Sequence, residues 1–533
     1  MTLSPGVLAE ATSDPLSVGQ GSYQASWDSL ESQYQVPEWF RDAKFGIWAH
    51  WTAQSQPEQG DWYARRMYIQ GERDYDYQRE HYGHPSKAGF KDIDHLWHAE
   101  HWDPEKLMSL YKAAGARYFV ALANHHDNFD CWNSKYQAWN SVNIGPHKDI
   151  VGLWEKAARA EGLRFGVSVH AARAWNWFEV AQGSDTNGPL KGVPYDGTLT
   201  KADGMGTWWD GYDPQELYAQ NHPPGAPPDE AYCRKFGLRT LQLIDDYKPD
   251  LLYFDDSVLP LRKVDKKYGL SIAAHYYNAS ARWHGTNEAV MTCKHLGEDQ
   301  RRALVWDIER GKTEAIDPVP WQTDTCIGNW HYNRSIFERH RYKTAAQVVP
   351  MLVDIVSKNG NLLLSIPMRG DGTIDSDELE FLRQMADWIK VNGECIYSTR
   401  PWKICGEGPA LNVNETNRFG GVKDVSKQAL TAADIRFTTK GDSLYAIALG
   451  WPEDGALRIK SLGAKAGLLD RNIVRISLLG DRRTEIVEHG AEALNQPVQP
   501  PALHWIRSTD ELTVDLPKER PGNYAWALKI TLE

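Results

Sequence analysis

Several features that mark common protein classes are rare or missing in this sequence. Its 533 residues include six cysteines, and none form a C-x-x-C pair, which argues against a zinc ribbon or a dithiol redox motif. No apolar run approaches the roughly 18–20 residues that a membrane-spanning helix needs. The formal charge of −12 and the lack of a lysine or arginine run argue against nucleic acid or anionic lipid as a partner. We therefore expect a globular protein with neither kind of partner.

Motifs for phosphate and for common metal centres are also missing. No glycine-rich fingerprint follows an apolar run, and neither H-x-H nor H-E-x-x-H occurs among the 18 histidines. Residues 1–26 are small and polar and lack the basic and apolar regions of a signal peptide. They fit the front of a mature secreted or periplasmic protein, which we prefer, or a cytoplasmic start.

Aromatic residues that carry a polar atom are abundant. The chain has 23 tryptophans and 24 tyrosines against 13 phenylalanines. Such rings suit a partly wet surface that contacts a sugar, because one end is apolar and the other forms hydrogen bonds. A large core rich in tryptophan would give the same counts, so composition alone does not separate the two interpretations.

From about residue 40 to 395, short apolar runs alternate with amphipathic helices. The runs lack a polar face, as buried parallel strands do, and between them Asp103-Pro104 predicts a helix start and Gly115 its end. Seven or eight such alternations predict an α/β fold with a (β/α)8-like barrel of the TIM type, with a doubly wound sheet as the alternative. The predicted strands are 44–51, 118–123, 165–170, 251–256, 289–294, 304–309 and 361–367.

The character of the chain changes after Pro401. Short alternating segments such as 443–450 and 524–532 are separated by Gly, Pro, Asp and Asn, which predicts a C-terminal antiparallel β-sandwich. We therefore divide the chain into an N-terminal extension, a catalytic barrel and a sandwich, at residues 1–36, 37–400 and 401–533.

Polar residues stand at or just after the ends of six of the predicted barrel strands. Active sites of such barrels form at the carboxyl ends of the strands, so these residues are the candidates for chemistry. They are His50, His125, His126, Asp127, His170, Asp255, Asp256, Lys294, His295, Glu309 and Arg310.

Two chemistries use such a set. The ligands of a metal-dependent hydrolase would be His125, His126, Asp127 and Asp255. Adjacent side chains on a strand point to opposite faces, however, so His125 and His126 are not expected to share an ion. A glycosidase needs two carboxylates on two walls of one pocket, and Asp255 and Glu309 follow different strands.

Blocks of sequence occur in order between about residues 37 and 402. They are WFRDAKFGI (39–47) with HW (50–51), AGARY (114–118) with HHD (125–127) and WNS (132–134), PDL (249–251) with YFD (253–255), WQTDTCIG (321–328) with WHY (330–332), NGNLLL (359–364), and NGECIY (392–397) with RPW (400–402). Together they closely resemble the α-L-fucosidases of glycoside hydrolase family 29. The resemblance implies a barrel followed by a β-sandwich.

The resemblance also implies roles for individual residues. It makes Asp255 the nucleophile in preference to Asp256. It favours Glu309 as the acid/base over Glu314, because the 12 residues from Glu309 to Trp321 resemble the family's spacing. Positions similar to the family's sugar-binding residues hold His50, Trp62, His125 and His126.

The chain departs from the family in two places. The stretch 168–170 (SVH) stands where many members have Tyr-Tyr-Ser, so a tyrosine contact is expected to pass to His170. The stretch 293–295 (CKH) stands where they have Asn-Asp-Arg, so an arginine contact falls to Lys294, a point charge rather than a planar fork. Both changes leave room for α-L-galactose as the sugar.

We therefore expect a retaining exo-glycosidase that hydrolyses terminal α-L-fucosyl linkages of oligosaccharides or glycoconjugates by double displacement. No metal or organic cofactor is expected, and homo-oligomerisation stays open. The alternatives are an α-L-galactosidase or related glycosidase on the same scaffold, a metal-dependent hydrolase, and a non-catalytic carbohydrate-binding protein. Tryptophans expected near the sugar, because they follow strand ends, are Trp51, Trp62, Trp132, Trp175 and Trp177.

Overall fold

The computed structural model describes residues 16, 18, 20–257, 267–412, 415–418, 421–424, 428–483 and 500–533. Most of residues 1–19 in the expected N-terminal extension, and the side chain of Asp256, lie outside the described part.

Eight parallel strands close into a barrel in the order β1-β2-β3-β4-β5-β6-β8-β9. The barrel prediction is confirmed, the doubly wound alternative is wrong, and the seven predicted strands match observed ones to within two residues at each end. The barrel strands are β1 (Phe45–Ala49), β2 (Tyr118–Asn124), β3 (Arg164–Val169), β4 (Leu251–Ser257), β5 (Val290–Lys294), β6 (Val305–Glu309), β8 (Trp321–Cys326) and β9 (Gly360–Ser365).

The strand β8 is absent from the sequence prediction. Its residues are all buried although most of them are polar, because they form hydrogen bonds across the barrel interior. Gln322 Nε2 donates to Asp307 Oδ1 at 2.7 Å, and Tyr118 OH donates to Gln322 Oε1 at 2.9 Å. A strand with polar partners on its buried face has no apolar run to reveal it.

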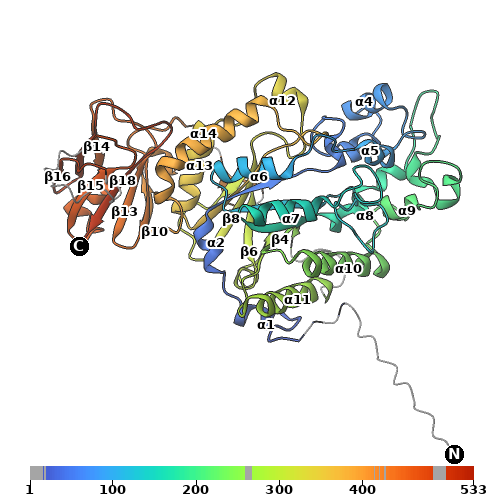
Figure 1. The fold of residues 1–533 in the computed structure, drawn as a ribbon, viewed down its shortest axis with the longest axis horizontal. Helices are drawn as coiled ribbons and strands as arrows, with labels where there is room; N and C mark the ends of the chain where they lie inside the picture. Colours follow the sequence, from blue (N-terminus) through green and yellow to red (C-terminus); the bar gives the residue numbers. More distant parts are fainter. Residues whose placement is uncertain are drawn as a thin grey trace, which may run out of the picture.

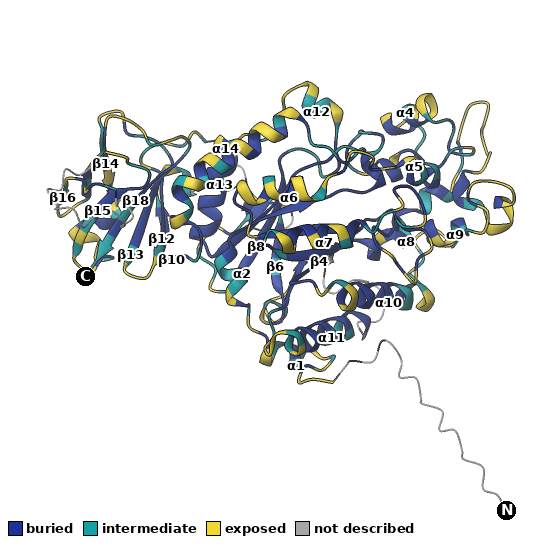
Figure 2. Cartoon of the chain, in the orientation of Figure 1, coloured by how far each residue is buried: buried dark blue, intermediate teal, exposed yellow. Residues whose placement is uncertain are grey.

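Helices surround the barrel, with exposed outer faces and buried strands inside them (Figures 1 and 2). The predicted helix start is confirmed, since Asp103 accepts a hydrogen bond from Lys106 N at 3.0 Å and Pro104 opens α6. No helix in the described ranges is long and apolar enough to cross a membrane. The larger helices are α6 (Pro104–Ala113), α7 (Ile150–Ala160), α10 (Glu230–Tyr247), α11 (Lys267–His284), α13 (Ala345–Ser357) and α14 (Ser376–Asn392). The shorter ones are α1 (Trp27–Gln33), α2 (Glu38–Ala43), α3 (Tyr63–Arg66), α4 (Arg73–His81), α5 (Phe90–Leu96), α8 (Ala174–Trp177), α9 (Pro214–Leu217) and α12 (Arg334–Glu338).

Two antiparallel sheets form the C-terminal domain, which confirms the predicted sandwich. A five-stranded sheet has the order β10-β12-β13-β18-β15 and a three-stranded sheet the order β14-β17-β16, with a shared apolar core. The domain lies beside α13 and α14 (Figure 1), where Trp388 Nε1 donates to Ala525 O at 2.9 Å. The strands are β10 (Arg400–Glu407), β12 (Ile435–Lys440), β13 (Ser443–Ala448), β14 (Ala456–Ile459), β15 (Ile473–Leu478), β16 (Trp505–Arg507), β17 (Leu512–Asp515) and β18 (Trp526–Leu532).

A small additional sheet joins the two domains. Its strand β7 (Gly311–Lys312) follows the barrel strand β6, and its strand β11 (Val422–Lys423) comes from the connection between β10 and β12. The C-terminal domain therefore reaches back to the carboxyl end of a barrel strand.

Candidate active site

A small pocket lies at the carboxyl ends of the barrel strands. It brings together six of the residues predicted for the site, namely His50, Trp62, His125, Asp255, Lys294 and Glu309. Five further lining residues were not among the predicted site residues: Trp48, Asp61, Asp324, Trp330 and His331.

Two carboxylates in this pocket share one ammonium group. Lys294 Nζ lies 2.5 Å from Asp255 Oδ1 and 2.7 Å from Glu309 Oε2. The sum of these contacts, 5.2 Å, is the largest separation that the two oxygens can have. Glu314, the second choice for the acid/base, is exposed and is not part of the pocket lining.

The charges around Asp255 keep it ionised. Burial would raise its pKa, but the Lys294 ammonium group and the contacts of His126 and His170 together outweigh burial and hold the pKa well below its usual range. Burial would likewise lower the pKa of Lys294, but Asp255, Asp324 and Glu309 raise it well above its usual value. Lys294 is therefore a fixed positive charge between the carboxylates.

A third carboxylate, that of Asp324, lies close to the Lys294 ammonium group. Its Oδ2 lies 3.7 Å from Lys294 Nζ and accepts a hydrogen bond from Tyr253 OH at 3.0 Å. Burial raises the pKa of Asp324. Sequence reasoning missed this residue because β8, which carries it, has no apolar pattern.

Two histidines lie against Asp255 on the side away from Lys294. His126 Nε2 and His170 Nδ1 lie 3.3 and 3.2 Å from Asp255 Oδ2. His126 Nδ1 also donates to His170 O at 2.8 Å, and His170 N donates to Asn124 Oδ1 at 3.0 Å. The structure thus places His126 and His170 where they orient the Asp255 carboxylate, outside the pocket lining.

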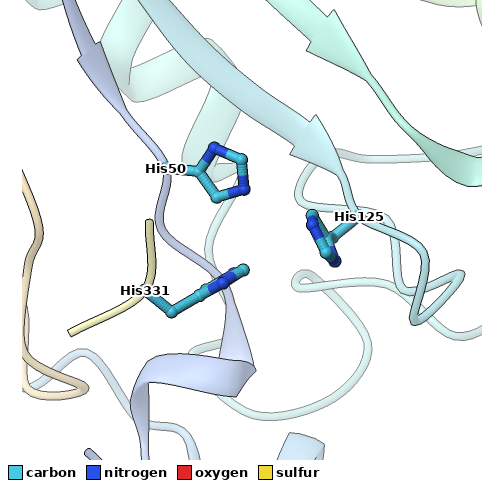
Figure 3. Close-up of side chains that lie close together, drawn as sticks. All are labelled: His50, His125 and His331. Atoms are coloured by element: carbon cyan, nitrogen blue, oxygen red, sulfur yellow. The ribbon is translucent and has the colours of Figure 1, made fainter. Parts of the chain in front are cut away.

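Three other imidazoles converge on the pocket (Figure 3). The ring centroids of His50, His125 and His331 lie 4.9–5.2 Å apart, and nitrogen atoms of this trio lie within 4.8 Å of one another. His125, His126 and His170 form a second such trio. Either trio is close enough for a transition-metal ion as well as for sugar hydroxyl groups.

The expectation that His125 and His126 point apart is wrong. Their ring centroids are 4.3 Å apart. β2 ends at Asn124, so both residues lie beyond the strand, and Asn128 takes a left-handed φ of 64° as the chain turns. The alternation of side chains along a strand does not extend to residues that follow it.

The imidazoles in this pocket are neutral. Burial lowers the pKa values of His50 and His125 well below their usual value, and that of His331 to about 3. Among the described residues, neither nitrogen of His50 has a hydrogen-bond partner. Buried polar atoms without partners are rare, so these nitrogens indicate a site for a polar ligand.

Hydrogen bonds behind the imidazoles assign their protons. Gln54 Nε2 donates to both Asp127 Oδ2 and His125 Nδ1, at 2.9 and 2.8 Å, which leaves His125 Nε2 as a donor. Thr52 Oγ1 donates to Asp127 Oδ2 at 3.4 Å and lies 3.2 Å from His331 Nε2, which leaves His331 Nδ1 as an acceptor. A sugar hydroxyl group can both accept and donate a hydrogen bond. His125 and His331 together offer one donor and one acceptor.

Trp62 lines the mouth of the pocket in an unusual backbone conformation. Its φ of 67° lies in the left-handed region, which bulky residues rarely adopt, and 37% of the residue is exposed. Its ring packs edge-on against Trp177 at 6.2 Å. An exposed aromatic face at the mouth of a polar pocket suits stacking on a sugar ring.

The other tryptophans expected near a sugar do not line this pocket. Trp51 packs against Trp97 in the core and donates to Arg369 O at 2.7 Å, and Trp132 is fully buried. Trp175 stacks on His222 in a separate cavity. The pocket instead uses Trp48 and Trp330, whose ring centroids are 5.5 Å apart.

Asp61 and His331 come from loops, where the rule of polar strand ends does not apply. Asp61 Oδ1 accepts a hydrogen bond from His331 N at 2.9 Å, and its Oδ2 accepts one from Asn329 Nδ2 at 3.0 Å. The motif WHY (330–332) signalled this loop, but nothing in the residues alone assigned it to the pocket.

Comparison with known proteins agrees with this geometry. The Alpha-L-fucosidase family model matches residues 11–394, and the Alpha-L-fucosidase C-terminal domain model matches residues 428–531. Tissue alpha-L-fucosidase of Rattus norvegicus is 28% identical over 96% of this chain and 92% of its own length. Alpha-L-fucosidase of Branchiostoma floridae is also 28% identical, over 83% of this chain and 84% of its own length. The crystal structure of Thermotoga maritima alpha-fucosidase in complex with fucose matches with a TM-score of 0.67 and 25% identity, over 96% of this chain and 100% of that chain. This chain belongs to the α-L-fucosidase family.

Proposed function

We infer that the protein is a retaining α-L-fucosidase that releases terminal α-L-fucosyl groups from oligosaccharides or glycoconjugates, with Asp255 as nucleophile and Glu309 as acid/base. The observation that carries this assignment is the separation of at most 5.2 Å between Asp255 Oδ1 and Glu309 Oε2. Retaining glycosidases hold their carboxyl groups about 5–5.5 Å apart, whereas inverting ones need about 6.5–9.5 Å to admit a water.

The first displacement forms a fucosyl ester. Asp255 attacks the anomeric carbon, the bond from that carbon to the leaving oxygen breaks, and Glu309 gives its proton to that oxygen. Since Lys294 holds the pKa of Asp255 well below its usual range, the nucleophile is ionised throughout the neutral and mildly acidic range.

The second displacement releases fucose. A water gives one proton to Glu309, its oxygen attacks the anomeric carbon, and the ester bond to Asp255 breaks. Two inversions give net retention, and Glu309 ends protonated as it began.

The histidines and Trp62 account for recognition of the sugar. His125 and His331 offer a donor and an acceptor, His50 offers two buried nitrogens without described partners, and Trp62 presents an aromatic face at the mouth. Neutral groups suit a substrate with hydroxyl groups and no charge.

Chemical rescue of two variants tests the assignment. Asp255→Ala should lose nearly all activity on an aryl α-L-fucoside, and azide should restore turnover with β-fucosyl azide as product, because azide enters the space that the carboxylate leaves. Glu309→Ala should form the fucosyl ester from an activated aryl fucoside, and azide should then give α-fucosyl azide.

Glu314→Ala is the matched control, since Glu314 lies five residues from Glu309 and is exposed. Its activity should match that of the unaltered protein. Near-normal turnover by Asp255→Ala, or loss of activity in Glu314→Ala with an active Glu309→Ala, would overturn the assignment.

A further inference from the structure

We propose that Asn417, in the connection between β10 and β12 of the C-terminal domain, is a positioning residue for Glu309, so that the acid/base is held in place from outside the barrel. The inference rests on the proposed role of Glu309 and adds a residue that orients it.

The connection takes a long path for neighbouring strands. β10 and β12 pair as antiparallel strands, yet residues 408–434 separate them. Strands paired in this way can be joined by a two-residue turn. The described part of the connection instead returns to the barrel, where β11 pairs with β7 through Val422 with Lys312 and Lys423 with Gly311.

Asn417 contacts the backbone of Glu309 directly. Its Nδ2 donates to Glu309 O at 2.7 Å. The carbonyl group of the next residue, Arg310, accepts a hydrogen bond from Asp424 N at 3.1 Å. Both bonds come from the C-terminal connection and hold consecutive carbonyl groups at the end of β6.

The barrel holds the same segment from its other side. Arg310 N donates to Asp324 O at 2.8 Å, and Thr323 Oγ1 donates to Gly311 O at 2.7 Å. Residues 309–311 therefore lie between β8 and the C-terminal connection. The orientation of the Glu309 side chain depends on both.

The backbone after Glu309 needs such support. Arg310 has a φ of 49°, in the left-handed region that residues other than glycine avoid. Conformations of this kind persist when surrounding contacts over-determine them. Without the hydrogen bond from Asn417, the turn that points Glu309 into the pocket loses one of these contacts.

The packing at Gly311 shows how closely Asn417 approaches. A Cβ on Gly311 would lie 2.0 Å from Asn417 Nδ2, a distance that no side chain tolerates. Asn417 itself is 8% exposed. Glycine at position 311 thus leaves the space that the Asn417 amide group occupies.

Asp424 anchors the connection to the barrel a few residues later. Its Oδ2 accepts hydrogen bonds from Thr325 Oγ1 at 2.7 Å and from Lys343 Nζ at 3.1 Å. Thr325 follows Asp324 on β8, which lines the pocket. The connection is therefore fixed to the strand beside β6, and Asn417 can hold Glu309 in a constant place.

A dependence on leaving groups distinguishes positioning of the acid from general structural damage. An aryl fucoside with a dinitrophenyl leaving group needs little protonation, whereas phenyl fucoside needs a well-placed acid. In Asn417→Asp, which keeps the size of the side chain and replaces the donor by an acceptor, kcat/KM should fall about tenfold or more on phenyl fucoside and less than about twofold on dinitrophenyl fucoside.

Three further variants complete the experiment. Gly311→Ala should give the same pattern, because the added methyl group displaces the Asn417 amide group. Lys423→Ala is the control, since it removes an exposed ion pair with Glu415 and leaves the β11 backbone in place, and it should match the unaltered protein on both substrates. Glu309→Ala sets the pattern for complete loss of the acid.

The outcomes separate this inference from the proposed function. If Glu309→Ala shows the leaving-group dependence and neither Asn417→Asp nor Gly311→Ala does, or if both lose activity equally on the two substrates, Asn417 does not position the acid. If Glu309→Ala itself shows no such dependence, the acid/base assignment is wrong and the inference is overturned with it.

Discussion

Replacing Lys294 with methionine should move the acidic limb of the pH–rate profile to higher pH. As the proposed nucleophile, Asp255 must be ionised to attack, so activity should be lost as the pH falls through its pKa. In the unaltered protein the Lys294 ammonium group holds that pKa well below the usual range of a carboxyl group. Methionine keeps most of the side-chain volume and removes the charge.

The contact distance sets the size of the effect. Two unit charges 2.5 Å apart interact by about 7 kcal/mol at an effective dielectric constant of about 20. Water that enters the space left by the ammonium group will replace most of this stabilisation of the carboxylate. If one fifth of the interaction energy is lost, the pKa of Asp255 still rises by about one unit, since one unit equals about 1.4 kcal/mol.

The assay is the pH dependence of kcat/KM on an activated aryl fucoside, because that parameter reports groups of the free enzyme. Lys294→Arg should keep the acidic limb close to that of the unaltered protein, since the charge remains. Lys358→Met is the matched control. Lys358 is also buried and paired, with its Nζ 3.0 Å from Asp354 Oδ2, but it does not line the pocket.

An acidic limb that stays in place in Lys294→Met, in protein that unfolds at a normal temperature, would refute the reasoning. So would an equal shift in Lys358→Met, because the effect would then not arise from contact with the nucleophile.

Three other predictions follow from the same site. Burial lowers the pKa of His170 to about 4 and that of His331 to about 3, below the usual 6.5, so both stay neutral in the folded protein while they gain protons in the unfolded chain. As the pH falls from about 6.5 to 4, His170 alone should therefore lower the free energy of unfolding by about 3 kcal/mol. Burial raises the pKa of Asp127 to about 6, which acts in the opposite direction, so the measurement is the difference in urea unfolding between the unaltered protein and His170→Phe, and a difference that does not change with pH would contradict the prediction. Trp62→Ala should raise KM about tenfold and change kcat little, because the ring adds binding at the mouth of the pocket; steady-state kinetics measure this, and a fall in kcat alone would count against it. Dialysis against EDTA should leave turnover unchanged. If turnover were lost and Zn²⁺ restored it, a metal would instead be assigned to the imidazole trios.

Sequence reasoning located most of the barrel because its strands are buried on both faces. The run 118–123 is apolar throughout and the run 361–367 is mostly so, and each corresponds to an observed strand. β8 has the same place in the barrel but fills it with Gln322 and Asp324, which bond to polar partners inside. Hydrophobic patterns cannot reveal a strand whose burial depends on partners far away in the sequence.

The residues of the candidate site likewise divide into those that the sequence predicted and those that it did not. Asp255, Glu309 and His50 were predicted because they end apolar strands, where barrels of this type place their chemistry. Asp61 and His331 reach the pocket from loops, and no local pattern states where a loop will lie. The placement of His126 behind Asp255 also depends on how the chain turns after β2, which alternation along a strand does not describe.

The connection that returns from the C-terminal domain limits how freely the two domains can be exchanged in a designed chimera. A chimera that joins this barrel to the β-sandwich of a relative would keep every pocket-lining residue and still lack Asn417 and Asp424 beside β6. Exchanges that carry residues 408–434 along with the barrel would preserve the contacts. In a designed exchange, the boundary between barrel and replacement sandwich should therefore lie after residue 434, inside the sandwich, and not at the start of the domain.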